Sequence, residues 1–290
     1  MKKIIVMVIA VIFIISCKDM KRVNPTDPAA SNYAGMHYTG SIGNLSEVTD
    51  FDAYGNDIFI VDETAALLYC FDKNGDEKWE TEPDVFKAPK SVHLNNSYIY
   101  VLDAWGAPDG NTLTVISTSG ILSDFAVNLT ANAHKVIVDD SFIYIAYETY
   151  IEKYNKDIIL NKLNSTNIII GSAGTADGQF MEISDMCFYN NEIVVADSEL
   201  DRISFLNLSG GFLRKIEPGT DIKGIDVKDG ILYVPCEAGI MEYSCSNGNK
   251  LKTWADYGEG NGKVIKPSLI DVNNTFVYVE NAASIKVFEP

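Results

Sequence analysis

A short β-rich pattern occurs six times along this chain, and a fixed repeat length limits the possible folds more than any other feature of the sequence. The copies begin at Ile58, Ile99, Ile143, Ile193, Leu232 and Val277, which places their starts 39 to 50 residues apart. Each copy is a run of apolar and aromatic residues of the kind that favours a strand. The chain is therefore built from six equivalent units of about 44 residues.

Each unit contains more than one strand. A large apolar residue, which we call the anchor, precedes each run by seven positions; the anchors are Phe51, Val92, Val136, Met186, Ile225 and Ile270. Turn residues such as Gly55-Asn56 and Asp229-Gly230 separate anchor and run, and they suit tight hairpins. A third strand follows every run and a more polar fourth strand follows most of them. We predict an all-β, six-bladed β-propeller of four-stranded antiparallel blades over residues 33–290.

The two ends of the repeat region complement each other. The sixth unit stops after its third strand, at Phe288-Glu289-Pro290, and residues 36–42 form a strand-like segment that belongs to no unit. Pairing this N-terminal strand with the last blade would close the ring and remove an exposed sheet edge. We expect the ring to close in this way.

One unit carries a more specific signature. A glycine-rich loop runs from Gly171 to Phe180 and ends in Gly-Gln-Phe, and residues 193–205 contain Val-Ala-Asp-Ser followed by Arg202-Ile203. This stretch, to residue 216, resembles an NHL repeat. The match is weaker elsewhere, as at Tyr147 and Pro235. The resemblance implies a six-bladed propeller over roughly residues 36–290.

The start of the chain predicts export and lipid attachment. Lys2 and Lys3 precede an apolar run of 12 residues, 4–15, which is too short to span a bilayer comfortably. Ser16-Cys17 follows and resembles the bacterial lipobox, which implies that Cys17 is acylated; an ordinary cleaved signal with a chance cysteine is the alternative. We expect a signal peptide at 1–16, lipidated Cys17 with a flexible tether to residue 32, and a location outside the cytoplasm on a bacterial cell membrane.

Charge and cysteine content exclude some functions. The formal net charge is −17, so the surface repels nucleic acid and we expect no nucleic-acid partner. Besides Cys17, the chain has Cys70, Cys187, Cys236 and Cys245, without the paired spacing of a zinc site. We expect these four to be buried free thiols.

Aligned positions in successive blades converge at the channel mouth of a propeller. Two residues before the anchors come Thr49, Lys90, His134, Ser184, Lys223 and Ser268, and one residue before come Asp50, Ser91, Lys135, Asp185, Gly224 and Leu269. This polar collar mixes both charge signs. We predict that ligand binds at a mouth lined by Asp50, Lys90, His134, Asp185 and Lys223.

A second aligned set follows the anchors by one residue and comprises Asp52, His93, Ile137, Cys187, Asp226 and Asp271. Four of these, Asp226, Asp271, Asp52 and His93, come from consecutive blades and could form an arc. Because calcium favours oxygen-rich sets, the three aspartates are candidate calcium ligands. The alternative is that they cap turns or face solvent. Only His134 of the three histidines lies at the collar, which disfavours a three-histidine zinc site.

The sequence contains no GxSxG elbow, HExxH pair or phosphate-binding glycine loop, so it carries no known catalytic set. We expect a membrane-tethered module that binds or scaffolds a protein, peptide or glycan, and that is more a binding protein than an enzyme. The alternative is a calcium-dependent hydrolase or lyase that acts on a small molecule at the channel mouth. A propeller fold by itself does not decide between them.

Overall fold

The computed structural model describes residues 36–43, 45–104, 111–129, 132–157, 167–282 and 284–289. The signal peptide expected at 1–16, Cys17 and the tether expected to residue 32 lie outside these ranges. Within them, no helix is both long and apolar enough to cross a membrane.

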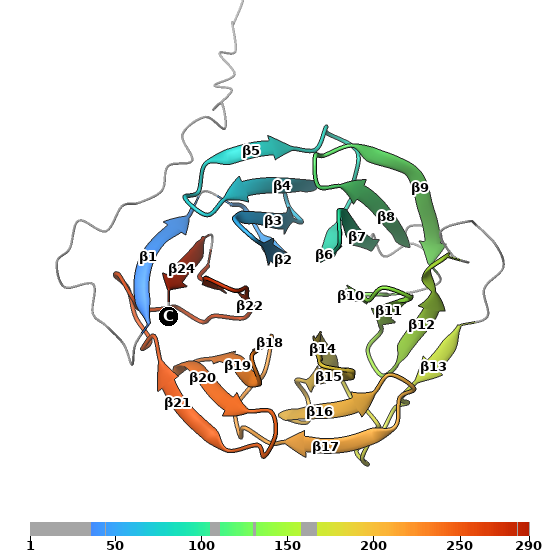
Figure 1. Cartoon of the computed structure of the whole chain (residues 1–290), viewed down its shortest axis with the longest axis vertical. Helices are drawn as coiled ribbons and strands as arrows, with labels where there is room; N and C mark the ends of the chain where they lie inside the picture. Colours follow the sequence, from blue (N-terminus) through green and yellow to red (C-terminus); the bar gives the residue numbers. More distant parts are fainter. Residues whose placement is uncertain are drawn as a thin grey trace, which may run out of the picture.

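The described strands form six four-stranded antiparallel sheets arranged as a ring, which confirms the six-bladed β-propeller (Figure 1). The first strands, which surround the central channel, are β2 (Val48–Tyr54), β6 (Pro89–Asn95), β10 (Lys135–Val138), β14 (Ile183–Tyr189), β18 (Asp226–Lys228) and β22 (Ile270–Val272). The second strands are β3 (Asp57–Asp62), β7 (Tyr98–Ala104), β11 (Phe142–Ala146), β15 (Glu192–Asp197), β19 (Ile231–Cys236) and β23 (Val277–Glu280).

The outer half of each blade follows the same order. The third strands are β4 (Leu67–Asp72), β8 (Asn111–Ser117), β12 (Ile151–Asn155), β16 (Arg202–Asn207), β20 (Gly239–Ser244) and β24 (Ile285–Glu289). The outermost strands are β5 (Glu77–Glu80), β9 (Leu122–Leu129), β13 (Ile168–Ile170), β17 (Phe212–Ile216), β21 (Lys250–Trp254) and, for the last blade, β1 (His37–Ile42). We number the blades 1 to 6 from β2 to β22.

The N-terminal strand closes the ring as expected. β1 pairs antiparallel with β24, from His37 opposite Glu289 to Ile42 opposite Ile285. Tyr38 packs edge-on against Phe288 with ring centroids 5.9 Å apart. Blade 6 is therefore built from both ends of the described chain, and β1 covers the edge of β24.

The apolar core lies between the blades. Buried side chains form a cluster at each of the six junctions; between blades 1 and 2, for example, Phe59 and Leu68 pack with Val92 and Val101. The six anchors are all buried, as their shared position predicts. Cys70, Cys187, Cys236 and Cys245 are buried free thiols, which confirms that expectation.

Tight hairpins join the first and second strands, and their residues explain the turns. Gly55, Asn96, Asn190 and Asp229 have positive φ, between 51° and 63°. Asparagine, aspartate and glycine tolerate this left-handed region better than other residues. These hairpins lie on the face opposite to the one where the first strands begin, and we call the latter face the mouth.

The loop of the NHL-like unit occurs twice in the structure. Ala173 bridges Phe180 across the first loop, and the Arg202 guanidinium donates to the carbonyl of Thr175 at 3.0 Å within it. Before blade 6, Tyr257 bridges Val264 in the same parallel manner, and the Lys286 amine donates to the carbonyl of Gly260 at 2.9 Å. In both loops, a cation from the third strand satisfies carbonyl groups of the loop. Membership of the NHL family stays a prediction.

Candidate functional site at the propeller mouth

The first strands reach the mouth through β-bulges. In blades 1, 2 and 4 the pairing with the second strand skips one residue, namely Thr49, Lys90 and Ser184. A bulge redirects the side chains around it. All three bulged residues occupy the same aligned position, two before the anchor, so the bulge is a repeated feature of the blades.

The aligned residues meet at a cavity of about 700 Å³ in the mouth. Five of its lining residues occupy the bulge position of five blades: Lys90, His134, Ser184, Lys223 and Ser268. Exposed Glu148 and Glu182, from blades 3 and 4, line it as well. The structure thus brings together three of the five predicted ligand-binding residues, which are Lys90, His134 and Lys223.

Lys90 and Lys223 already have partners. The Lys90 amine forms an ion pair with Glu63 of blade 1. The Lys223 amine lies 3.2 Å from a carboxylate oxygen of Asp221, on an exposed surface. The Lys223 pair is exposed and therefore weak, whereas the side chains of Lys90 and Glu63 are half-buried.

His134 has a structural bond in addition to its place in the cavity. Its Nε2 donates to the carbonyl of Ile183 at 2.5 Å and so ties blade 3 to blade 4. Burial lowers the pKa of His134, which favours the neutral ring. His134 therefore lines the cavity, but its Nε2 is already bonded to the protein and is not free to bind a ligand.

Asp50 and Asp185, the other two predicted residues, lie beneath the mouth instead of lining it. Each is only 3% exposed. The Lys135 amine lies between them, 2.9 Å from an oxygen of Asp50 and 2.9 Å from an oxygen of Asp185. Because Lys135 comes from blade 3 and the carboxylates from blades 1 and 4, this ion triad spans the channel. We call it the floor of the mouth.

Opposing effects determine the charge of the floor. Burial disfavours the charged amine of Lys135, but Asp185 and Asp50 outweigh burial and the pKa of Lys135 is raised. Burial also raises the pKa of Asp185, against the lowering effect of Lys135. One cation thus faces two carboxylates with little solvent to screen them.

Many of the aligned polar residues join neighbouring blades. At the bulge level, Thr49 Oγ1 donates to the carbonyl of Pro89 at 2.8 Å and Ser184 Oγ donates to that of Ile222 at 3.0 Å. One residue further on, Asp50 accepts from the Val92 N–H at 3.0 Å. At the same level, Ser91 Oγ accepts from Val136 at 3.1 Å and Asp185 accepts from Ile225 at 2.8 Å. We call these bonds inter-blade latches.

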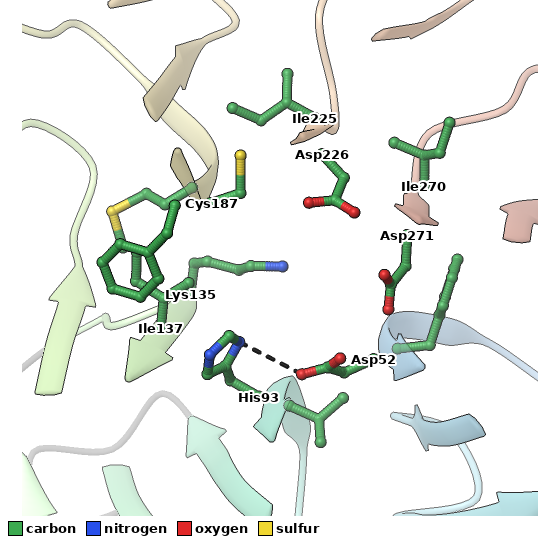
Figure 2. Close-up of a pocket in the computed structure, with 13 residues that line it drawn as sticks. Asp52, His93, Lys135, Ile137, Cys187, Ile225, Asp226, Ile270 and Asp271 are labelled. Atoms are coloured by element: carbon green, nitrogen blue, oxygen red, sulfur yellow. Dashed lines mark ion pairs between the residues drawn. The ribbon is translucent and has the colours of Figure 1, made fainter. Parts of the chain in front are cut away.

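Below the floor, the channel contains a chamber of about 220 Å³, and its side chains include Asp52, His93, Asp226 and Asp271 (Figure 2). The predicted arc therefore exists. Each aspartate also latches the next blade: Asp52 accepts from the Leu94 N–H at 2.5 Å, Asp226 accepts from that of Val272 at 2.6 Å, and Asp271 accepts from that of Ala53.

The chamber raises the proton affinity of two carboxylates, those of Asp226 and Asp271. Burial raises the pKa of Asp226 to about 7. Burial, followed by the charges of Asp52 and Asp226, raises the pKa of Asp271 well above its ordinary value. His93 Nδ1 lies 3.4 Å from an Asp52 oxygen (Figure 2). The other ring nitrogen, Nε2, contacts the carbonyl of Val138 at 3.2 Å. Burial lowers the pKa of His93.

The role of Asp52, Asp226 and Asp271 as calcium ligands stays a prediction. They share the chamber, but one oxygen of each is bonded to a backbone N–H. Among the described residues, no three His, Cys, Asp or Glu side chains are arranged closely enough to hold a metal ion. The geometry therefore accounts for the three aspartates as latches without requiring a cation.

Three residues of the site were not among the sequence candidates. The sequence could have identified Lys135, because it lies one residue before its anchor, as Asp50 and Asp185 do, and is the one cation at that aligned position. Glu148 and Glu182 lie outside the aligned first-strand positions. No signal in the sequence marks them, because loops from two blades bring them to the cavity.

Three further aspartates, near the ends of second strands, hold nearby loops in place. Asp62 accepts from the N–H of Ser46 at 2.6 Å and Asp103 accepts from that of Ala88 at 2.7 Å. Asp197 accepts from the Met181 N–H at 2.9 Å and lies 3.9 Å from the Arg202 guanidinium. Each aspartate ends a second strand and holds the loop that precedes the first strand of its blade.

No protein-family model and no curated protein matches this sequence. Solved structures do match, 1033 chains in all, which shows that the fold is common and carries no function by itself. One is a computationally designed protein, Ika8, with 10% identity and a TM-score of 0.53, covering 86% of this chain and 98% of that chain. Another is a structural genomics protein of unknown function from Bacteroides thetaiotaomicron, with 12% identity and a TM-score of 0.64, covering 88% of this chain and 72% of that chain. At these identities, the likeness supports the fold alone.

Proposed function

We propose that this protein is a binding or scaffolding module of the bacterial cell envelope, held to the membrane by lipid on Cys17, which takes a protein, peptide or glycan at the propeller mouth. The observation that carries the binding role is the mouth cavity of about 700 Å³, to which five blades each contribute the side chain at the same aligned position. A rigid ring that presents polar side chains around one cavity is typical of a ligand site.

The support for the membrane anchor is the sequence pattern alone. A charged start, an apolar run of 12 residues and Ser16-Cys17 are typical of a lipidated, exported protein. Replacing Cys17 with serine should abolish palmitate labelling in a bacterial host and leave unprocessed precursor. Labelling that persists in Cys17→Ser would show that the lipid is elsewhere.

Site-specific photo-cross-linking tests the binding role. A photoreactive amino acid replaces exposed Asn132, which lines the mouth cavity, or Leu251 on the outermost strand β21, which is 51% exposed. Irradiated cells that make the full-length chain should yield a defined adduct from position 132 and none from position 251. An adduct only from position 251 would move the interaction to the outer edge, and absence of any adduct would contradict the proposal.

The alternative function, a calcium-dependent hydrolase or lyase, has one observation in its favour, the three aspartates that share the chamber. Their latch bonds give them a structural role, so we place function at the mouth. A ligand stabilises the folded state only if it binds to that state. If the aspartates serve only as latches, calcium should change the melting temperature of the chain by less than about 1 °C. A larger rise that a chelator reverses would favour the enzyme alternative.

A further inference from the structure

A second cleft adjoins the mouth cavity. This cleft, of about 330 Å³, shares Lys223 and Ser268 with the mouth cavity and extends along Glu237, Lys266 and Pro267 between blades 5 and 6. Because the two cavities share lining residues, they adjoin, and we call the pair the mouth groove. A ligand that occupies both must reach from the mouth cavity into the adjoining cleft, which an extended chain can do.

Most of the charged side chains in the mouth groove that lack a partner are acidic. Lys90 and Lys223 are paired with Glu63 and Asp221. Glu148 and Glu182 are both exposed and line the cavity. Among the described residues, neither carboxylate has a hydrogen bond or an ion pair.

Glu148 and Glu182 are held next to each other. The N–H of Ile183, the residue after Glu182, donates to the carbonyl of Glu148 at 2.8 Å. The two carboxylates therefore come from adjacent blades and border the same part of the cavity. A cation bound at this part of the cavity can therefore meet carboxylates from both loops. The net charge of −17 also attracts cations to this surface.

The second cleft of the mouth groove also contains a positive charge, that of Lys266. Lys266 is exposed, and among the described residues its amine has no ion pair; it lines the second cleft together with Glu237. A polyamine would leave Lys266 without a partner. A polypeptide can offer a cationic side chain at one end of the groove and a carboxylate at the other.

We propose that the mouth groove binds an extended segment of a partner protein, with a lysine or arginine of that segment between Glu148 and Glu182 and a carboxylate of it against Lys266. This inference rests on the proposed function, because it requires binding at the mouth. It adds the class of ligand and the residues that select it.

An array of immobilised hexapeptides, which covers neutral, acidic, basic and mixed-charge sequences, tests the proposal with the chain from residue 18 onward. The retained peptides should contain lysine or arginine, and their binding should weaken as ionic strength rises. The double variant Glu148→Gln/Glu182→Gln should lose about tenfold in affinity for them. Lys266→Gln should weaken only those peptides that also contain aspartate or glutamate.

Glu199→Gln is the matched control, because Glu199 is exposed in a hairpin of blade 4 on the same face but does not line the mouth groove. Like each substitution in the double variant, Glu199→Gln removes one negative charge. It should leave peptide binding unaltered. All these variants change exposed side chains, so their melting temperatures should match that of the unaltered chain.

Retention of neutral or acidic peptides alone, or equal peptide binding by the double variant and the unaltered chain, would overturn the inference. An adduct from position 132 in the cross-linking experiment would leave the proposed function intact in either case. Failure of the two ideas is therefore distinguishable.

Discussion

Removal of the Lys135 charge is the sharpest test of the floor of the mouth. Lys135→Met retains an unbranched apolar stem but leaves Asp50 and Asp185 facing each other without a cation. The side chains of the two aspartates are 5% and 4% exposed, so solvent screens them poorly. Breaking a buried ion pair by removing one partner destabilises a protein by about 3–5 kcal/mol. We expect a loss in that range.

The assay is urea unfolding of the chain from residue 18 onward, followed by tyrosine and tryptophan fluorescence and accompanied by thermal melts. For a domain of this size, a loss of about 3–5 kcal/mol lowers the melting temperature by roughly 10 °C. Lys223→Met is the matched control, because the Lys223 side chain is 53% exposed and its partner Asp221 is also at the surface. It should change the free energy of unfolding by about 0.5 kcal/mol or less.

The pH dependence separates charge from packing. Without Lys135, nothing offsets the burial of Asp185, so its folded-state pKa rises further and the folded state holds a proton that the unfolded state releases. A raised folded-state pKa adds stability at low pH that is lost as pH increases. The deficit of Lys135→Met should therefore be larger at pH 8 than at pH 5.

A second substitution examines the same point. Adding Asp185→Asn to Lys135→Met removes one of the two uncompensated charges and should restore part of the lost stability. A loss below about 1 kcal/mol, or an equal loss at pH 5 and pH 8, would refute the reasoning that the floor is held by charge.

Three further predictions concern the ring, the chamber and a turn. A chain that starts at Gly43 lacks β1, which pairs along β24, and should lose at least about 5 kcal/mol relative to one that starts at Tyr33; equal melting temperatures would show another closure. Because burial raises the pKa of Asp226 from 3.8 to about 7, its proton stabilises the fold fully below about pH 4, and this stability is lost as pH rises through 7. Asp226→Asn should flatten that slope in urea titrations, by on the order of 3 kcal/mol between pH 4 and pH 8, and an unchanged slope would count against it. Ala66→Gly should stabilise the fold by up to about 1 kcal/mol because Ala66 has φ of 56°, whereas Ala53→Gly in β2 should destabilise it by about as much; the opposite order of melting temperatures would contradict this.

Much of the candidate site depends on contacts that no local pattern contains. The aligned positions locate Lys90, His134 and Lys223 at the mouth, because equivalent residues in repeated blades must lie at the same depth. The same alignment assigns Asp50 and Asp185 to the mouth, although they lie beneath it. The reason is that Lys135, 85 residues from Asp50 in the chain, draws both carboxylates into the channel.

The sequence by itself determined the fold class, the number of blades, the turn positions and the closing strand. All of these follow from local properties, because strand alternation, turn residues and repeat length are written along the chain. Only the tertiary structure decided which polar side chains bond other parts of the protein and which remain free to bind a ligand. Asp52, Asp226 and Asp271 became latches because the ring places a backbone N–H of the next blade beside each carboxylate. Glu148 and Glu182 became neighbours because blades 3 and 4 pack side by side and bring two loops together, a contact that no local sequence pattern encodes.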